Sequence, residues 1–264
     1  MEIINKINNA INGIKGLIAF MTKIPIGYFN CNFEEMANYY IFIIFIGFFI
    51  GLVGALIVYP FYFFNIEGYF IGVIVLFTML YIQGFHHVDG LGDYGDAQMV
   101  MGDSKRKLEV MRDKYIGVGA FCYIFFVELT SILLISHFYH LFPFIYFLKL
   151  IILIEGGSRF GSFVCACLGS PLENSTAKYF VSKNNLLHLI LGIIIMLIVG
   201  GVLLNLKVIS IVIVITALIL NIFISNSAKK SFGGVSGDIL GASSEITRVV
   251  LLIITIFVVQ FIFI

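Results

Sequence analysis

The residues best suited to chemistry lie in a charged segment, 83–119, that is flanked by long apolar runs. Within it, Asp89, Asp93 and Asp96 are spaced four and then three residues apart. On a helix this spacing places the three carboxylates on one stripe, spread over about 60° of the circumference. Carboxylates gathered in this way repel each other unless a cation lies among them. The spacing therefore predicts a site for Mg²⁺ or Mn²⁺, hard ions that take oxygen ligands and share them with phosphate.

Basic residues near this stripe are candidates for binding phosphate. Lys105 and Arg112 belong to the same charged segment, and Arg159 lies toward the predicted cytoplasmic end of an apolar helix. A charge at membrane depth is costly unless it is paired or hydrated. Glu155 precedes Arg159 by four residues, so the two side chains can pair on one helix. Pairing with Glu155 and binding of phosphate both remain open for Arg159.

A second polar segment, 231–247, carries two further acids. Asp238 and Glu245 are seven residues apart and so share one face of a helix. The pair Gly233-Gly234 precedes them and permits a tight approach of the backbone. The segment is therefore a second candidate contributor to the site.

The composition indicates a membrane protein. Of 264 residues, 60% are hydrophobic and 12% are charged, and the mean hydropathy is +1.06. Soluble domains carry about twice that share of charge. We therefore predict an all-α, polytopic transmembrane helical bundle that forms one integral membrane domain, 1–264. Seven spans are expected, at about 38–64, 68–85, 117–139, 141–163, 186–205, 208–225 and 247–264.

Two features of the first 64 residues suggest how helices pack there. Isoleucines recur at helical spacing within segment 1–36, which predicts an amphipathic helix. This helix lies at the cytoplasmic interface or packs on a soluble loop, and both readings remain open. In the first span, Gly47, Gly51 and Gly54 form a smooth face suited to close helix packing.

The basic residues predict the orientation. With a cytoplasmic N-terminus, twelve Lys and Arg residues fall in cytoplasmic segments and only Lys207 falls in an outer loop. Both polar segments, 83–119 and 231–247, then face the cytoplasm of a multi-pass protein in the cell membrane. The lipid bilayer is thus an expected partner. The net charge of +1, with no long basic patch outside the loops, gives no support for a nucleic-acid partner.

Several catalytic motifs are absent from the sequence. It has no Gly-x-Ser-x-Gly, no phosphate-binding P-loop, no Cys-x-x-Cys and no dinucleotide fingerprint. What remains is a set of carboxylates and cations at the membrane edge. Carboxylate-held Mg²⁺ suits phosphoryl transfer to a hydroxyl, which needs no covalent enzyme intermediate.

Three motifs resemble one enzyme family. The stretch HVDGLGDYGD from His87, followed by MRDKYIGVG from Met111, resembles the cobalamin 5'-phosphate synthase family, also called adenosylcobinamide-GDP ribazoletransferases. The segment 20–25, FMTKIP, is similar to the family's N-terminal motif. The segment 233–242, GGVSGDILGA, is similar to its C-terminal motif. All three occur in the family's order and together cover nearly the whole chain.

The resemblance implies a reaction and a cofactor. The family joins adenosylcobinamide-GDP to α-ribazole or its 5'-phosphate, which gives adenosylcobalamin or its 5'-phosphate and releases GMP. Its cofactor is Mg²⁺. The ribose hydroxyl attacks the phosphorus nearer the corrinoid, and GMP leaves.

The resemblance also implies roles for individual residues. Asp89, Asp93 and Asp96 would hold the metal on the diphosphate. His87 matches the motif histidine. The remaining catalytic candidates would complete the metal shell or activate the hydroxyl, and they are Asp113, Asp238 and Glu245. Substrate phosphate would be bound by Lys105, Arg112 and Arg159.

The sequence departs from the family pattern at three positions. Phe85 replaces a usual glycine, Lys23 replaces a usual arginine, and Arg248 stands where a second acid is expected. One unbroken helix from 86 to 96 would put His86, not His87, on the aspartate stripe. We therefore expect either a helix break near Asp89-Gly90 or an indirect role for His87.

Two other functions compete with this one. A CDP-alcohol phosphotransferase also uses aspartates at helix ends, but its motif needs Ala-Arg after Asp-Gly and a different aspartate spacing. A secondary transporter with a carboxylate ion site should hold its acids on broken helices at mid-membrane, whereas these acids gather at one edge. The sequence leaves open whether the chain forms a homo-oligomer.

Overall fold

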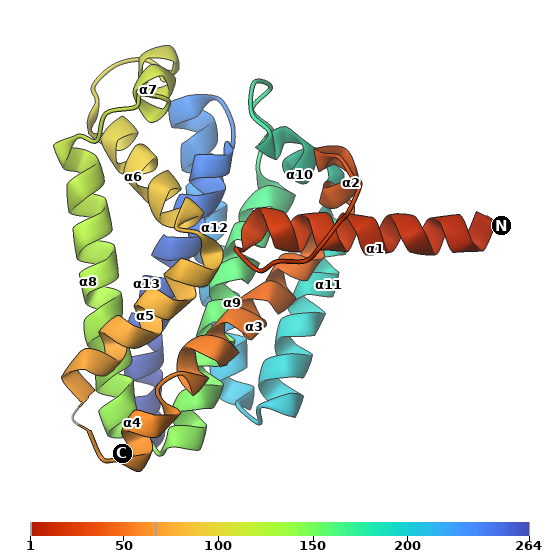
Figure 1. The fold of residues 1–264 in the computed structure, drawn as a ribbon. Helices are drawn as coiled ribbons and strands as arrows, with labels where there is room; N and C mark the ends of the chain where they lie inside the picture. The colour runs from red at the N-terminus through yellow and green to blue at the C-terminus, as the bar shows by residue number, and fades with distance from the viewer. Residues whose placement is uncertain (1, 67, 264) are drawn as a thin grey trace.

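The structure, a computed structural model, describes residues 2–66 and 68–263. These residues form a helical bundle with no β-strand among them, apart from an isolated parallel bridge between Pro171 and Val235. Its helices are drawn in Figure 1 and run, in chain order, α1 (Glu2–Met21), α2 (Phe33–Ala37), η1 (Tyr40–Phe42), α3 (Ile43–Leu56), α4 (Tyr59–Phe63), η2 (Gly68–Phe70), α5 (Ile71–Gln83), α6 (His86–Met99), α7 (Ser104–Met111), α8 (Val118–Leu141), α9 (Phe144–Leu168), α10 (Ala177–Lys183), α11 (Leu186–Leu197), η3 (Ile198–Leu203), α12 (Lys207–Phe232) and α13 (Gly237–Phe263).

The described residues contain six or seven candidate membrane spans, against the seven predicted. Six stretches of the described chain are long and apolar enough to cross a membrane. They are Tyr40–Phe63, Val118–Leu141, Phe144–Leu168, Leu186–Leu203, Lys207–Phe232 and Gly237–Phe261. A seventh arises if the pair α5 and α6 is counted as one span, although the two helices are bent by 93°. The predicted all-α polytopic bundle is thus confirmed.

Helix boundaries differ from the predicted ones on the side that carries the polar segments. The predicted spans end at 225 and begin again at 247, whereas α12 continues to Phe232 and α13 begins at Gly237. The polar residues of 231–247 therefore lie mainly in the first turns of α13, packed inside the bundle. Residues 1 and 264 of the predicted segments 1–36 and 247–264, and residue 67 between the first two predicted spans, lie outside the described residues.

The buried helix α9 is the centre of the bundle, and glycines on α3 allow close contact with it. A Cβ atom on Gly47 would lie 2.8 Å from the carbonyl oxygen of Glu155, and one on Gly51 would lie 2.8 Å from that of Ile151. A Cβ on Gly54 would lie 2.6 Å from Met79 of α5. Any larger side chain would push these helices apart. The close-packing face predicted from the three glycines is confirmed.

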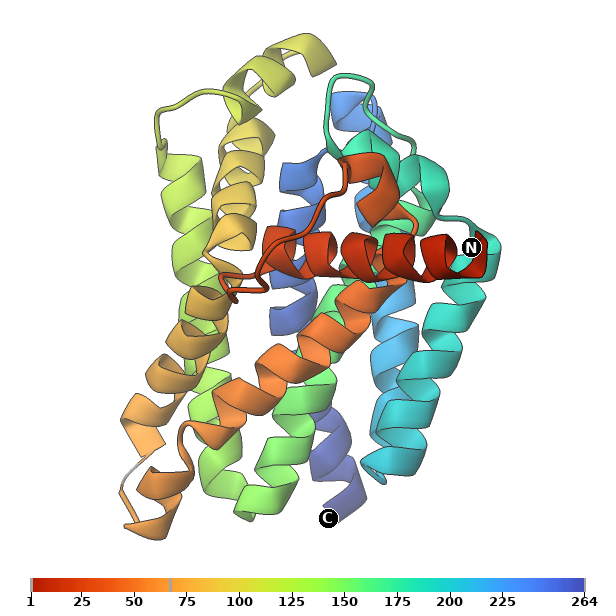
Figure 2. The ribbon, with the colours of Figure 1, turned by 45° about the vertical axis from the view of Figure 1, so that its right-hand side comes forward.

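Helix α1 lies across the bundle rather than along it (Figures 1 and 2). Leu17 is buried on one side, whereas Ile7 and Ile11 are exposed. The chain after α1 is tied to the bundle where the backbone N–H of Lys23 donates to the carbonyl oxygen of Ile82, at 2.7 Å. This crosswise, amphipathic helix fits a position at the membrane interface, which stays a prediction.

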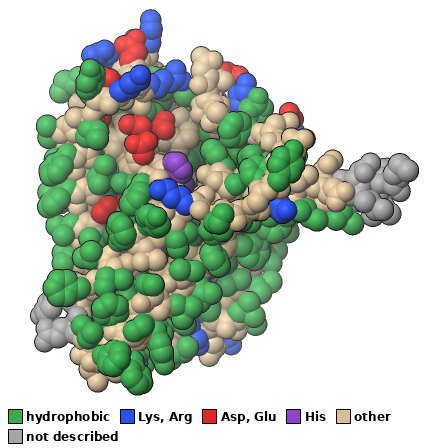
Figure 3. Space-filling model, viewed as in Figure 1, with side chains coloured by type: hydrophobic (Ala, Val, Ile, Leu, Met, Phe, Trp, Pro, Cys, Tyr) green, Lys and Arg blue, Asp and Glu red, His purple; other side chains and the backbone are tan. Residues whose placement is uncertain are grey.

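Charged side chains gather at the end of the bundle where α6 and α7 lie. Figure 3 shows acidic and basic groups concentrated there, around a histidine, above a surface that is mostly hydrophobic. Helix α6 begins at the level of α1 and continues past it toward α7 (Figures 1 and 2). The aspartates of α6 are therefore carried beyond the apolar body of the bundle.

Candidate functional site

A sharp turn between α5 and α6 sets the direction of the aspartate helix. Gly84 and Phe85 both adopt the left-handed backbone conformation, with φ of 74° and 63°. Glycine takes this conformation readily and other residues do so at a cost of about 1–2 kcal/mol. Phe85, which replaces the usual glycine of the motif, thus adopts a backbone conformation that favours glycine. Its ring and that of Tyr81 lie beneath the ammonium of Lys23, at 5.8 and 5.1 Å.

The aspartate helix is continuous beyond this turn. Helix α6 runs unbroken from His86 to Met99, so the break expected near Asp89-Gly90 does not occur and lies instead at Gly84-Phe85. The left-handed turn had no sequence signal, because phenylalanine rarely adopts it. The other expectation, an indirect role for His87, becomes the one to consider.

The backbones of helices α6 and α13 are in direct contact where the two helices cross. A Cβ atom on Gly90 would lie 2.8 Å from the carbonyl oxygen of Asp238, and one on Gly241 would lie 3.1 Å from the Cα of His87. Only glycine allows this approach on both helices. The crossing places the first turn of α13 beside the aspartate stripe, so the two polar segments predicted from the sequence meet.

Three carboxylates form what we call the acidic edge, namely Asp89, Asp93 and Asp238. Asp89 is exposed and the other two are half-buried. Asp93 lies in α6, outside the six spans. Burial, followed by the negative charges of three neighbouring aspartates, raises the pKa of its carboxyl to about 7. Within the described residues no Lys or Arg forms an ion pair with the acidic edge.

Asp96 is on the same stripe but has a different partner. Its carboxylate accepts the backbone N–H groups of Gly117, at 2.6 Å, and Ala120, at 2.9 Å. These N–H groups belong to the start of α8, so Asp96 caps that helix. A carboxylate has about four lone-pair positions, and two remain available here.

The acidic edge has the chemistry of a magnesium site without a preformed cage. Oxygen donors and excess negative charge suit Mg²⁺, which usually keeps water or substrate oxygens in its shell. Among residues 2–66 and 68–263, however, no three His, Cys, Asp or Glu side chains converge closely enough to enclose a metal. The residues fit an ion that would be bound jointly with substrate oxygens.

Two of the three basic candidates, Lys105 and Arg112, lie with Asp113 on or just after α7. Lys105 is exposed on that helix. Arg112, also exposed, donates to the carbonyl oxygen of Asn174 at 3.3 Å. Asp113 is exposed, and its carboxylate accepts the N–H of Tyr115 at 3.4 Å. Their predicted roles in binding or catalysis stay predictions.

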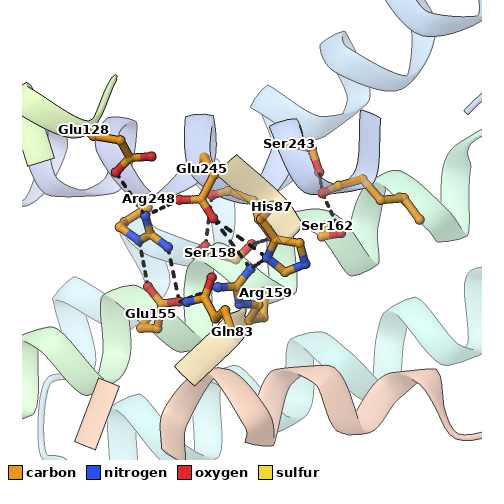
Figure 4. Close-up of polar contacts among 12 residues, drawn as sticks. Gln83, His87, Glu128, Glu155, Ser158, Arg159, Ser162, Ser243, Glu245 and Arg248 are labelled. Atoms are coloured by element: carbon orange, nitrogen blue, oxygen red, sulfur yellow. Dashed lines mark hydrogen bonds and ion pairs between the residues drawn. The ribbon is translucent and has the colours of Figure 1, made fainter. Parts of the chain in front are cut away.

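Deeper in the bundle, carboxylates and guanidiniums form what we call the buried ion network, which consists of Glu128, Glu155, Arg159, Glu245 and Arg248 (Figure 4). Glu155 is its centre. Its Oε1 accepts from Arg159 Nη2 at 2.7 Å, and its Oε2 accepts from Arg248 Nε at 2.8 Å. Arg248 also contacts Glu245. Pairing of Glu155 with Arg159, one of the two readings left open, is thus observed.

The departure at Arg248 has a structural explanation in this network. Glu155 and Arg248 come from α9 and α13 and are each 1% exposed. A buried carboxylate without a partner is strongly destabilising, so the basic residue balances acids from three helices. Glu128 of α8 approaches Arg248 Nη1 at 3.6 Å, and Gln83 of α5 donates to Glu155 at 2.9 Å.

His87 connects the buried ion network to the surface. Its Nδ1 contacts Arg159 Nη1 and lies 3.8 Å from Glu245 Oε1. A guanidinium can only donate hydrogen bonds, so this contact favours the tautomer in which Nδ1 accepts and Nε2 carries the ring proton. Figure 4 shows the rest of the ring directed away from the network, toward the side of Ser162.

A cavity of 440 Å³ opens beside His87 and the acidic edge. Its polar wall includes His86, His87, Asp89 and Asp238. Arg159 and Glu245 do not line it, because both are buried behind His87. The cavity thus joins the two predicted polar segments and has the size of a small-molecule site.

Sequence reasoning missed several residues of this region. Gln83 stands at the end of an apolar helix, and a polar residue at that depth was the available signal. Tyr40 and Phe180 line the cavity but gave no signal as site residues, because aromatic side chains are common throughout the chain, and Phe20 was noted only as part of the 20–25 motif. Their proximity depends on the packing of α1, η1 and α10.

Comparison with known proteins shows which family the chain resembles over most of its length. Residues 13–256 match the family model described as cobalamin-5-phosphate synthase. The chain is similar to the adenosylcobinamide-GDP ribazoletransferase of Clostridium acetobutylicum, with 30% identity over 88% of this chain and 90% of the relative. It is similar to the protein of the same name from Pyrococcus abyssi, with 27% identity over 92% and 97% of the two chains. No solved structure matches.

Proposed function

The chain belongs to the cobalamin-5-phosphate synthase family, and from this premise we propose that it joins adenosylcobinamide-GDP to α-ribazole or its 5'-phosphate. The products are adenosylcobalamin or its 5'-phosphate, and GMP. The observation that carries the proposal is an acidic edge without ion pairs, beside a cavity that His87 also lines. We place the reaction at the cytoplasmic face of the cell membrane, in accord with the basic residues of the loops.

Magnesium fits the acidic edge in this proposal. Asp89 and Asp93 would hold the ion, together with the remaining lone pairs of Asp96 on the same stripe. When bound there, Mg²⁺ neutralises the oxygens of the substrate diphosphate and makes its phosphorus more open to attack. Substrate oxygens would supply the ligands that these carboxylates do not.

The transfer itself exchanges one phosphorus–oxygen bond for another. The ribose hydroxyl oxygen bonds to the phosphorus nearer the corrinoid, while the bond from that phosphorus to the bridging oxygen breaks. GMP leaves with the bonding electron pair. Asp238, which lines the cavity, accepts the proton of the hydroxyl.

His87 acts in this scheme as a hydrogen-bond donor. Because Arg159 contacts Nδ1, the Nε2–H group is the one available to a phosphate oxygen. Charge that develops on phosphate oxygens is stabilised by donors fixed in advance. Arg159 thus supports the reaction through His87, whereas direct binding of phosphate by Arg159 would require its side chain to leave the buried ion network.

The test is release of GMP by the purified, membrane-reconstituted protein from adenosylcobinamide-GDP and α-ribazole, with Mg²⁺ and with a chelator. We expect GMP only when both substrates and Mg²⁺ are present. Asp89→Asn should remove this activity. Asp103→Asn is the matched control, because Asp103 caps α7 and asparagine caps helices equally well. GMP release that is indifferent to Mg²⁺, or retained by Asp89→Asn, would refute the proposal.

A further inference from the structure

The cavity beside the acidic edge has a second wall of opposite character. Besides the side chains of its polar wall, it is lined by apolar side chains from α1, η1 and α10, which are Ala19, Phe20, Met21, Tyr40, Ala177 and Phe180. The proposed reaction uses only the polar wall. The apolar wall therefore has no assigned role, although it is part of the same 440 Å³ space.

Phe20 presents the accessible part of this wall. Its side chain is 40% exposed, whereas Phe180 and Tyr40 behind it are 2% and 1% exposed. The rings of Phe20 and Phe180 are nearly parallel, with centroids 6.0 Å apart and an interplanar angle of 6°. An edge contact with Phe33, at 5.4 Å, holds Phe20 from another side. Phe20 is thus a flat, apolar face held in place by its neighbours.

Tyr40 and Phe180 fix the floor behind this face. Their ring centroids are 4.9 Å apart, and the Tyr40 hydroxyl is hydrogen-bonded to Ser162 Oγ at 3.2 Å. The one polar group of the aromatic cluster is therefore satisfied within the protein. A ligand in this half of the cavity meets mainly rings and methyl groups, since the nearby Ser162 hydroxyl is hydrogen-bonded within the protein and, besides Tyr40 and Ser162, Thr176 has the one other hydroxyl among the described residues that line the cavity.

Size and polarity decide which substrate part suits the apolar wall. A 440 Å³ cavity accommodates a nucleoside but not a corrinoid with its attached nucleotide, which is several times larger. Guanine carries donors and acceptors along its edges, which would lose hydrogen bonds to water against apolar side chains. The benzimidazole base of α-ribazole is flat and has few polar atoms. Bases of this kind stack on aromatic side chains.

We propose that the apolar wall binds the base of the acceptor nucleoside, with the base stacked on Phe20 and the ribose hydroxyl directed toward the acidic edge. This inference rests on the proposed function and assigns the two substrates to different sides of the site. The donor diphosphate lies at the acidic edge, and the acceptor base lies against α1 and α10.

The kinetic test uses the full-length protein with substitutions at Phe20. Phe20→Ala should raise the KM for α-ribazole about tenfold or more, while the KM for adenosylcobinamide-GDP stays within about twofold. Phe20→Tyr should restore the KM for α-ribazole, because it keeps the ring. Phe126→Ala is the control, since Phe126 is an exposed phenylalanine on α8 away from the cavity. An unchanged KM for α-ribazole, or an equal rise for both substrates, would overturn the inference.

A binding test separates this inference from the proposed function. The chain contains no tryptophan, so Phe20→Trp introduces a single fluorescent reporter. We expect α-ribazole to quench its emission and GMP to leave it unchanged. Quenching by GMP alone, or by neither, would rule out the acceptor base as the occupant. Because this measurement needs no turnover, it stands even if the protein releases no GMP, which would refute the proposed function alone.

Discussion

The acidic edge and the buried ion network are built from the same kind of side chain and have opposite character. In the buried ion network, three glutamates share two guanidiniums at separations that include 2.7 and 2.8 Å. At the acidic edge, no Lys or Arg of the described residues lies within ion-pair distance of the three aspartates, and only the more distant charge of Arg112 acts on Asp238. Buried charges must be paired to be tolerated, whereas half-exposed acids can remain unpaired and attract a cation from solution. Charged side chains without a partner of opposite charge are therefore a better indication of a reactive site than charged side chains in general.

The largest effect should follow from removing a cation from the buried ion network. Arg248→Leu leaves the buried carboxylates of Glu155 and Glu245 short of a partner, which should lower the free energy of unfolding by about 3–5 kcal/mol. Thermal unfolding in detergent would measure this loss. Lys230→Leu, which removes an exposed charge at the end of α12, should leave the midpoint unchanged. Equal midpoints for both variants would mean that the pairing of Arg248 is not needed for stability.

Removing a carboxylate from the acidic edge should do the reverse. Asp93→Asn relieves repulsion among acids, so the unfolding midpoint should be retained or raised. Turnover should fall about a hundredfold or more, since a ligand to the proposed ion is lost. GMP release and thermal unfolding are measured on the same preparation. If Asp93→Asn were less stable but still active, the acidic edge would be needed for stability and not for turnover, contrary to this expectation.

Arg159 joins the two regions through His87, and a smaller effect is expected there. Lysine keeps the charge but lacks the planar fork of arginine. Arg159→Lys should therefore lower kcat about tenfold by releasing His87. The KM for adenosylcobinamide-GDP should stay within about twofold. A raised KM with an unchanged kcat would instead support the role predicted from the sequence, direct binding of substrate phosphate.

The smallest effect concerns pH. The ordinary pKa of the Asp93 carboxyl is 3.8, and the folded state raises it to about 7. Between these values the folded chain holds a proton that the unfolded chain releases, so stability falls as pH rises through this window. Without divalent cations, the unfolding midpoint should be lower at about pH 8 than at about pH 5. Asp93→Asn should reduce this difference, and the same slope in both proteins would contradict the raised pKa.

The sequence was sufficient for the bundle and for the meeting of its polar segments. Apolar runs of spanning length predict transmembrane helices because a bilayer offers no other partner to the backbone. The sequence did not predict where α12 ends and α13 begins. The serines and glycines of 231–247 are typical of loops, but most of them lie in helices that pack against one another. The turn at Gly84-Phe85 was also not predicted, because phenylalanine gives no indication of a left-handed backbone conformation.

The contacts between side chains of different helices were harder to predict than the helices themselves. Glu155 and Arg159 are four residues apart, so their contact could be read from helix spacing. The contact of Arg248 with Glu155 joins α13 to α9, and that of Asp96 with Gly117 joins α6 to the start of α8. Such contacts depend on how helices are placed in space. For this reason the sequence identified Asp96 as a candidate ligand and gave no indication that it caps a helix.

The glycine crossing of α6 and α13 has a consequence for how the protein is made. The two helices are far apart in the sequence, with α7 to α12 between them. While a ribosome is still producing those intervening helices, α6 has neither its crossing partner nor Asp238 beside it. A nascent or interrupted chain therefore cannot assemble the reaction centre, and catalytic competence is acquired at a late stage of biogenesis, when α13 settles against Gly90.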